Sequence, residues 1–348
     1  MSILDNKSKI FDIDTKNFYS EIINFAENFQ KSFSEAKNFS LPSYFIKAEK
    51  IVFCGMGASG MIGDFISLIA KKQSSFPVNV YKSADVPKFI DEKTIVFAIS
   101  ASGNTIETLN FFEKSVKQGA KIIAITQGGQ IEKLASKYAA PIYKFNYHSQ
   151  PRLALGQMFG SVLAILNKLG ILETEQNDFD QALIAIKHCI NKCGVEAEEK
   201  SNPAKKIAEK IHNKNILVWS GDFIFPVALR FSQQINENAK QLAFPNQLSE
   251  LHHNLINGLN FPIAKNHIVV FIHSKYYSPE IIKRIEISKD LLAKNGIEFI
   301  SIEAETTGYL AEILYLVLAL DLTSYYLAIL NNVDPEEIEN ISYIKSRI

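Results

Sequence analysis

The sequence predicts an α/β protein made of two similar halves, each a parallel sheet flanked by helices. Two observations carry this prediction. Continuously apolar segments such as 94–99 and 267–272 are typical of strands that are buried on both faces of a sheet. The order strand, polar turn, helix, Gly-containing link and strand occurs over 94–126 and again over 267–302. We therefore expect the two halves to be related by internal duplication.

The amino-acid composition is that of a globular protein and excludes several other classes of protein. The chain has 348 residues, of which 47% are hydrophobic and 21% charged, so it can bury large cores without disulfides. The 37 Lys and Arg residues balance the 37 Asp and Glu residues, which argues against a nucleic-acid partner. Three cysteines (Cys54, Cys189 and Cys193) cannot form the disulfide framework of a small secreted protein.

The most apolar stretch of the chain runs from 313 to 330. Asp321, Thr323 and Ser324 interrupt it, so we expect a buried core helix, and no membrane partner. The first residues show no apolar signal-peptide core. The expected protein is cytoplasmic and soluble.

The elements of the first half follow in order. Residues 1–48 are expected to form a helical amino-terminal extension, because Phe18, Ile22, Phe25 and Phe29 recur at helical spacing. The first domain is expected over 49–177. Its predicted strands are 51–54, 78–81, 94–99 and 121–126, and its helices include 61–72 and 105–118.

A charged helical linker over 178–203 is expected to separate the two halves. The second domain then spans 204–348 and includes a carboxyl-terminal helix. Asp334 and Pro335 predict the start of a helix, with Asp as N-cap and Pro in the first turn. The predicted strands of this domain are 215–219, 267–272 and 296–302.

A serine-rich turn carries the strongest functional signal. Ser100, Ser102, Gly103 and Thr105 stand between the end of a predicted strand and the start of a helix. Ligands of open parallel sheets bind at this edge, and a helix N-terminus favours a phosphate group. The alternative is an N-capped helix with a serine-rich turn and no ligand, to which we give about even odds on this motif alone.

A glycine-rich turn occupies the equivalent place after the first strand. Gly55, Gly57 and Gly60 fit the G-x-G-x-x-G pattern of dinucleotide-binding proteins, and Ser59 lies among them. The acidic residue expected about 20 residues later is missing, because Tyr81 stands near that place. The turn therefore suits a small sugar phosphate better than a dinucleotide.

These two turns, in this order, resemble the sugar-isomerase (SIS) domain. Further segments resemble the bifunctional phosphoglucose/phosphomannose isomerase family, from about residue 50 to the end. The resemblance implies two SIS-type halves, doubly wound and flavodoxin-like. Its segments are PRLALG at 151–156, NENAK at 236–240, His253-Asn254 with Gly258, and Asp334-Pro335 with Lys345.

Two positions depart from the family pattern. His252 stands where the family usually has Asn before its key His, and Leu255 stands where it usually has Glu. We expect the hydrogen bonding around His253 to differ from that of the family. These departures bear on the preference between sugars and not on the reaction type.

The resemblance implies an aldose–ketose isomerase that interconverts glucose 6-phosphate or mannose 6-phosphate with fructose 6-phosphate through a cis-enediol intermediate. Glu237 is the implied base that moves the proton, and a carboxylate suits this task chemically. Arg152 is implied to stabilise the enediolate charge, and His253 and Lys345 to open the sugar ring. Chemistry and the family pattern together imply that hydroxyl groups hold the phosphate, namely those of Ser59, Ser100, Ser102 and Thr105. The glycines implied to shape the supporting turns are Gly57, Gly60 and Gly103.

The resemblance also implies a homodimer whose active sites lie at the subunit interface, with His253 supplied by the neighbouring subunit. We predict no cofactor. We also predict no metal site, because spacings such as H-E-x-x-H and C-x-x-C are missing from the sequence.

Other functions remain open at this point. The protein could isomerise a single sugar phosphate, such as glucose 6-phosphate only. It could be a SIS-type regulatory module that binds a sugar phosphate without catalysis, although such a module has no use for Glu237, Arg152, His253 and Lys345 together. A dinucleotide-dependent enzyme is the weakest alternative.

Overall fold

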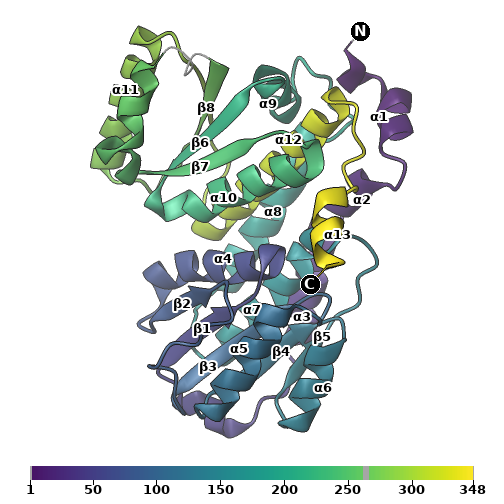
Figure 1. Ribbon diagram of the computed structural model, residues 1–348, viewed down its shortest axis with the longest axis vertical. Coiled ribbons are helices and arrows are strands. Elements are labelled where there is room, and N and C mark those ends of the chain that lie inside the picture. The colour runs from purple at the N-terminus through teal and green to yellow at the C-terminus, as the bar shows by residue number, and fades with distance from the viewer. Residues whose placement is uncertain (1, 262–265, 348) are drawn as a thin grey trace. The chain divides into compact units, whose positions relative to one another are not determined.

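The computed structural model describes residues 2–261 and 266–347 and divides into two compact units (Figure 1). Unit A comprises Asn24–Gln176. Unit B comprises Met1–Ile23 together with Asn177–Ile348, so the amino-terminal residues group with the second half of the chain. Each unit contains one parallel sheet.

Unit A has a five-stranded parallel sheet with the order β2-β1-β3-β4-β5. Its register places Ile51 opposite both Val78 and Ile95. The strands are β1 (Lys50–Cys54), β2 (Val78–Tyr81), β3 (Thr94–Ser100), β4 (Lys121–Thr126) and β5 (Ile142–Lys144), and the helices are α3 (Phe25–Ala36), α4 (Gly57–Gln73), α5 (Ile106–Lys117), α6 (Gln130–Lys137) and α7 (Leu155–Lys168), with short turns η2 (Ser43–Lys47) and η3 (Pro151–Leu153).

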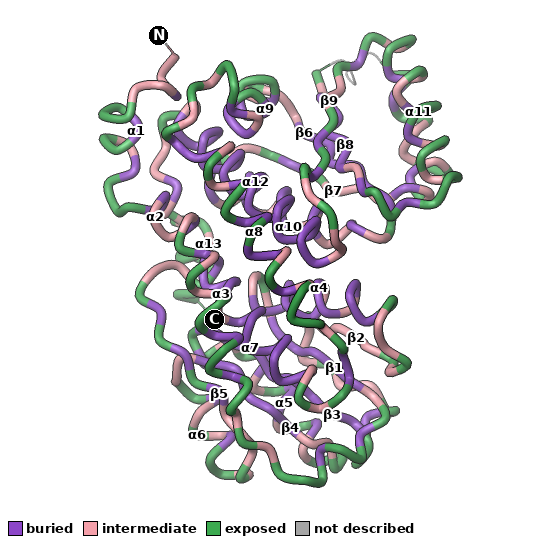
Figure 2. Tube along the Cα trace, turned by 180° about the vertical axis from the view of Figure 1, so that it is seen from behind, coloured by how far each residue is buried: buried purple, intermediate pink, exposed green. Residues whose placement is uncertain are grey.

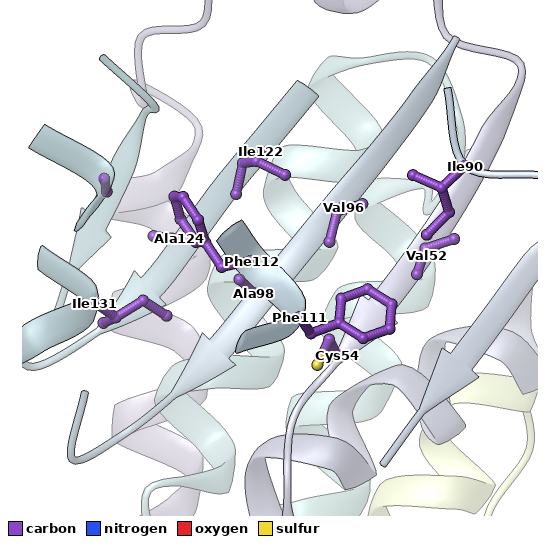
Figure 3. Packing of buried hydrophobic residues seen from close by; sticks show 11 residues of the cluster. Val52, Cys54, Ile90, Val96, Ala98, Phe111, Phe112, Ile122, Ala124 and Ile131 are labelled. Carbon is purple, nitrogen blue, oxygen red and sulfur yellow. The ribbon is translucent and has the colours of Figure 1, made fainter. Parts of the chain in front are cut away.

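Both faces of this sheet are covered by helices. On one face, Val52 and Val96 belong to a buried cluster with Phe111 and Phe112 of α5 (Figure 3). Residues one step along each strand point to the other face, where Phe53 and Phe97 stack at 4.9 Å between ring centroids. A sheet that is buried on both faces needs apolar residues at every strand position, as the sequence predicts.

Unit B repeats this plan. Its sheet has the order β7-β6-β8-β9, which matches β2-β1-β3-β4 of unit A strand for strand, and all its pairs are parallel. The α/β fold with two doubly wound halves is thus confirmed. The strands are β6 (Asn215–Gly221), β7 (Ala243–Leu248), β8 (His267–Ile272) and β9 (Glu298–Ile302).

The helices of unit B include one that is apolar all round. Helix α12 (Tyr309–Leu330) is long and apolar enough to cross a membrane, but 94% of its most apolar window is buried (Figure 2). It is the expected core helix. The others are α1 (Lys7–Ile13), α2 (Phe18–Ile23), α8 (Gln176–Cys193), α9 (Pro203–Ile211), α10 (Phe225–Gln234), α11 (Pro279–Lys294) and α13 (Glu339–Lys345), with short turns η1 (Ile3–Asp5), η4 (Asp222–Ile224), η5 (Ile235–Ala239), η6 (Glu250–His253) and η7 (Leu255–Asn260).

The amino-terminal residues are helical, as predicted, but in pieces. Phe18, Ile22, Phe25 and Phe29 are all buried. The helix breaks at Asn24, so α2 belongs to unit B and α3 to unit A.

The prediction of a helix that starts at Asp334 is wrong. Helix α13 begins only at Glu339. Asp334 closes a turn instead, because its Oδ1 accepts the Glu336 N–H at 2.8 Å. Its carbonyl accepts a hydrogen bond from Lys240, and its Oδ2 accepts one from Thr15. These contacts outside the segment fix Asp334 in a turn and not in a helix cap.

Candidate functional site

The serine turn lies at the carboxyl end of β3. Ser100 is buried, and its Oγ lies 2.9 Å from the Oγ1 of Thr105. The same Oγ accepts the Gly103 N–H at 3.0 Å. Ser102 is exposed, and its Oγ accepts the Asn104 N–H at 3.3 Å. The turn therefore has one serine that shapes it and one that faces solvent.

The glycine turn touches the serine turn. Ser59 lies in the first helical turn of α4, and its Oγ accepts the Ala101 N–H at 3.3 Å. The structure thus brings together three of the hydroxyls predicted to bind phosphate, those of Ser59, Ser100 and Thr105, and Ser102 lies in the same turn. They lie beside the N-termini of α4 and α5, where free N–H groups and the helix dipoles favour an anion.

A third loop supports this arrangement, and it was missed by the sequence analysis. Gly103 has φ +69°, and a Cβ there would lie 1.7 Å from the carbonyl oxygen of Gly128, in the loop after β4. Asn104 Oδ1 also accepts the N–H of Gln130, the first residue of α6, at 3.1 Å. The available signal was the Gly-Gly pair directly after the predicted strand that ends at Thr126.

The remaining glycines of the predicted set lie in the first turn of α4. Gly57 has φ +53°, and a Cβ there would meet no atom within 4 Å. Gly60 is buried three residues later. Both help the chain turn from β1 into the helix that carries Ser59.

Arg152 lies in the short turn η3, which contacts α4. The side chain is buried, and its Nη1 donates to Gln150 Oε1 at 3.3 Å. Burial argues against a solvent-exposed ion pair. A buried guanidinium gives a fixed, permanent positive charge.

Glu237 belongs to unit B and lies in a π-helical turn, Ile235–Ala239, that continues α10. Asn236 closes this turn by bonding to the backbone of Ala243 in both directions, at 2.9 and 3.3 Å. Lys240 ends the turn in the left-handed conformation, with φ +53°. Turns of this kind are short and occur frequently at functional sites.

The segment around Glu237 is bound along its length to α12 and the residues after it. Asn238 is fully buried and donates to Ser324 Oγ at 2.9 Å. The sequence analysis treated Asp321 and Ser324 only as polar interruptions of an apolar helix, and no local signal reveals their partners. The other contacts are Arg230 to Asp321 at 2.7 Å, Asn331 Nδ2 to the Ala239 carbonyl at 2.8 Å, and Lys240 Nζ to the Asp334 carbonyl at 2.5 Å.

The two neighbouring histidines differ in environment. His253 is exposed at the end of η6. The His252 ring is fixed, because its Nδ1 lies 3.1 Å from Arg284 Nη1 and its Nε2 lies 2.8 Å from Ser288 Oγ. Burial, with the charges of Arg284 and His253, lowers the pKa of His252. The uncharged form of His252 is therefore favoured, and its ring is held by Arg284 and Ser288.

Lys345 is exposed at the end of α13. The predicted residues thus divide between the units by sequence. Unit B contains Glu237, His253 and Lys345, each on a different element. Unit A contains Ser59, Ser100, Ser102, Thr105 and Arg152.

Two other features include none of the predicted site residues. A cavity of about 350 Å³, lined by Glu92 and Lys121 among others, lies where β4 begins, at the opposite end of the strand from Thr126. Cys189 and Cys193 are buried on α8, and burial raises the pKa of Cys189. Among residues 2–261 and 266–347, no group of three or more His, Cys, Asp or Glu side chains could hold a metal ion.

Known proteins resemble both halves of the chain. Residues 44–139 match the SIS domain, and residues 200–348 match the bacterial phospho-glucose isomerase C-terminal SIS domain. A bifunctional phosphoglucose/phosphomannose isomerase from Aquifex aeolicus is 35% identical, over 86% of this chain and 90% of that protein. One from Caldicellulosiruptor bescii is 30% identical over 95% of this chain and 98% of that protein.

Solved structures extend the likeness in fold. A hypothetical protein from Thermus thermophilus superposes with a TM-score of 0.76 at 14% identity, over 99% of this chain and 94% of that one. At this identity the likeness concerns the fold alone. It agrees with the repeated strand order of the two sheets.

Proposed function

The chain belongs to the bifunctional phosphoglucose/phosphomannose isomerase family, and from this premise we propose that it interconverts glucose 6-phosphate and mannose 6-phosphate with fructose 6-phosphate. The reaction is an intramolecular oxidoreduction, in which C2 of the aldose is oxidised as C1 is reduced. The single structural observation that carries the proposal is the contact between Ser59 and the serine turn, which joins the hydroxyl-bearing starts of α4 and α5.

The substrate phosphate is assigned to these hydroxyls. Ser102 is exposed, so its hydroxyl can donate to a phosphate oxygen. Ser100 and Thr105 share a hydrogen bond with each other, so one of their two hydroxyl protons would be left to donate to a phosphate oxygen. A dianionic group at this place gains from both helix dipoles without an ion pair.

Glu237 is assigned the proton transfer. Its carboxylate would take the proton from C2 of the aldose and return it to C1, while the carbonyl moves from C1 to C2. The cis-enediol forms between the two transfers. The π-helical turn and its contacts to α12 support this assignment, because a base must be held within hydrogen-bond reach of the carbon it deprotonates.

Arg152 is assigned the developing charge on the enediolate oxygen. A buried guanidinium cannot lose its proton, and it is already desolvated before the reaction begins. It stabilises negative charge more strongly than a solvated lysine would.

His253 and Lys345 are assigned the ring opening that precedes isomerisation. Imidazole exchanges a proton near neutral pH, and His252 beside it is already committed to Arg284 and Ser288. Both His253 and Lys345 are exposed in the single chain. Their exposure is compatible with the proposed homodimer, in which a neighbouring subunit would supply His253 to the active site.

The remaining predictions complete the proposal. The domains are proposed as an extension (1–48), a first SIS domain (49–177), a linker (178–203) and a second SIS domain with a carboxyl-terminal helix (204–348). We also propose a cytoplasmic enzyme that requires no cofactor and acts on hexose phosphates shared by glycolysis and gluconeogenesis.

A coupled assay tests the function. Purified protein treated with EDTA is given glucose 6-phosphate and mannose 6-phosphate separately, and fructose 6-phosphate is measured. Turnover of both supports the dual isomerase. Turnover of glucose 6-phosphate alone would narrow the function to one sugar. Binding of fructose 6-phosphate without turnover of either aldose would contradict the enzyme and favour a regulatory module.

A further inference from the structure

The described part of the amino-terminal segment, residues 2–23, contacts helix α12 through a buried carboxylate. Asp14 accepts the N–H groups of Phe18 at 2.7 Å and Tyr19 at 2.9 Å, and so it caps the start of α2. The same carboxylate accepts the hydroxyl of Tyr325 on α12 at 3.0 Å. The segment is therefore attached to α12 at a defined point, and helices α2 and η1 both pack against it.

Helix α12 transmits this attachment to the segment of Glu237. Ser324 directly precedes Tyr325, and its Oγ accepts the side-chain amide of Asn238 at 2.9 Å. Asn238 in turn directly follows Glu237 in the π-helical turn. Any shift of α12 at Tyr325 would move the partner of Asn238 with it.

A second connection runs outside α12. Thr15 Oγ1 donates to Asp334 Oδ2 at 3.1 Å. The carbonyl of Asp334 accepts Lys240 Nζ at 2.5 Å. Lys240 is the left-handed residue that ends the π-helical turn. Two hydrogen bonds in series thus join Thr15 to the carboxyl end of the turn that contains Glu237.

We propose that residues 1–23 form a positioning element for Glu237, with Thr15 and Tyr325 as positioning residues. This inference rests on the proposed role of Glu237 as the base. A π-helical turn is an uncommon local conformation, so contacts from outside must maintain it. A catalytic group that is displaced by about 1 Å can lose about a hundredfold in rate.

Two substitutions remove only the connecting hydroxyls, namely Thr15→Val and Tyr325→Phe. Thr15→Ser retains the hydroxyl and serves as the rescue variant. Tyr326→Phe is the matched control, because Tyr326 is the next residue of α12 and equally buried, yet its hydroxyl donates to the Cys193 carbonyl at 2.7 Å. The measurements are kcat and KM for glucose 6-phosphate, and hydrogen–deuterium exchange of residues 235–241.

The double variant Thr15→Val/Tyr325→Phe is expected to lose about tenfold in kcat, with KM within about twofold, because the phosphate-binding residues are unchanged. Hydrogen–deuterium exchange of residues 235–241 should become about fivefold faster, because the loss of one stabilising hydrogen bond raises the exchange rate by about that factor. Tyr326→Phe should keep wild-type kcat and exchange even if its melting temperature falls. Thr15→Ser should behave as wild type.

An unchanged exchange rate of residues 235–241 in the double variant would overturn the proposal. The proposal would also fail if Tyr326→Phe lost as much kcat as the double variant. The exchange measurement needs no turnover. If the wild-type protein isomerised neither sugar phosphate, the proposed function would fail. Exchange alone would then decide whether residues 1–23 hold the segment of Glu237.

Discussion

The guanidinium of Arg230 and the carboxylate of Asp321 form a two-point ion pair in which both side chains are at least 95% buried, with Nη2 2.7 Å and Nε 3.0 Å from the carboxylate oxygens. It joins α10 to α12 about two helical turns before Glu237. The carboxylate gives the buried guanidinium a counter-charge within a mostly apolar helix. Its burial raises the pKa of Asp321, and the attraction of Arg230 opposes that rise.

Asp321→Asn should be strongly destabilising. The variant removes the carboxylate that pairs with the buried guanidinium of Arg230, and breaking a buried ion pair costs about 3–5 kcal/mol in comparable cases. Urea unfolding followed by circular dichroism measures the loss. Asp290→Asn on the exposed part of α11 is the control and should change stability by less than about 0.5 kcal/mol. A cost below about 1 kcal/mol for Asp321→Asn would show that the pair is not essential to the packing of α12.

Glu237→Gln should abolish turnover and preserve the fold. An amide cannot accept the proton from the sugar carbon, and loss of a general base costs about 10²–10⁴ in rate. The coupled assay gives kcat, and calorimetric titration with fructose 6-phosphate gives the binding constant, which should stay near wild type. Glu280→Gln, at the exposed start of α11, is the control. Retained isomerisation in Glu237→Gln would remove this residue from the mechanism.

Substitutions of the two serines of the serine turn should differ in their effects on sugar-phosphate binding and on stability. Ser102→Ala removes an exposed hydroxyl, and water can replace its bond to the Asn104 N–H, so binding of fructose 6-phosphate should weaken by about 1.5–3 kcal/mol with little change in melting temperature. Ser100→Ala also removes the acceptor of the Gly103 N–H, so it should lower both binding and melting temperature. Titration calorimetry and thermal unfolding measure the two effects. Equal loss of stability in both variants would contradict this division.

Gly103→Ala should disrupt the phosphate-binding turn. The new methyl group would lie 1.7 Å from the Gly128 carbonyl oxygen, so the loop after β4 must move. Gly57→Ala is the matched control, because it has a similar positive φ but no neighbour within 4 Å. It should cost only the backbone strain of about 1–2 kcal/mol. If the two variants had the same melting temperature and affinity, close packing at Gly103 would be unimportant.

Stability should fall in mild acid because of His252. Its folded-state pKa is lowered, chiefly by burial, so the folded protein binds a proton there less readily than the unfolded chain. This contribution is complete above the unfolded pKa of about 6.5 and is lost as pH falls through the lower folded value. His252→Asn cannot titrate, so its unfolding free energy should fall less between pH 7.5 and pH 5.5. Parallel pH curves for the two proteins would contradict the assignment.

The sequence predicts the parts of the fold that depend on local signals. Central strands such as β3 and β8 are continuous apolar runs, and the serine turn is recognisable because it follows such a run. Strand β7 was missed because Pro245 and two polar residues interrupt it. An edge strand tolerates both features, since one side of its backbone needs no partner.

The environment of the proposed base could not be predicted from the sequence. Asn238 and Ser324 are 86 residues apart, and neither residue signals the other. The same holds for Thr15 and Asp334 at opposite ends of the chain. Asp334 also has a good helix-cap sequence, and only its distant partners explain why it forms a turn.

The contact between Asn238 and Ser324 has an evolutionary consequence. Both side chains are fully buried, so a change to one alone removes a hydrogen bond of the other inside the protein. Substitution of both by apolar side chains of matching shape would avoid that cost. Descendants of this chain should therefore change at positions 238 and 324 together, and an unpaired change at either should be selected against.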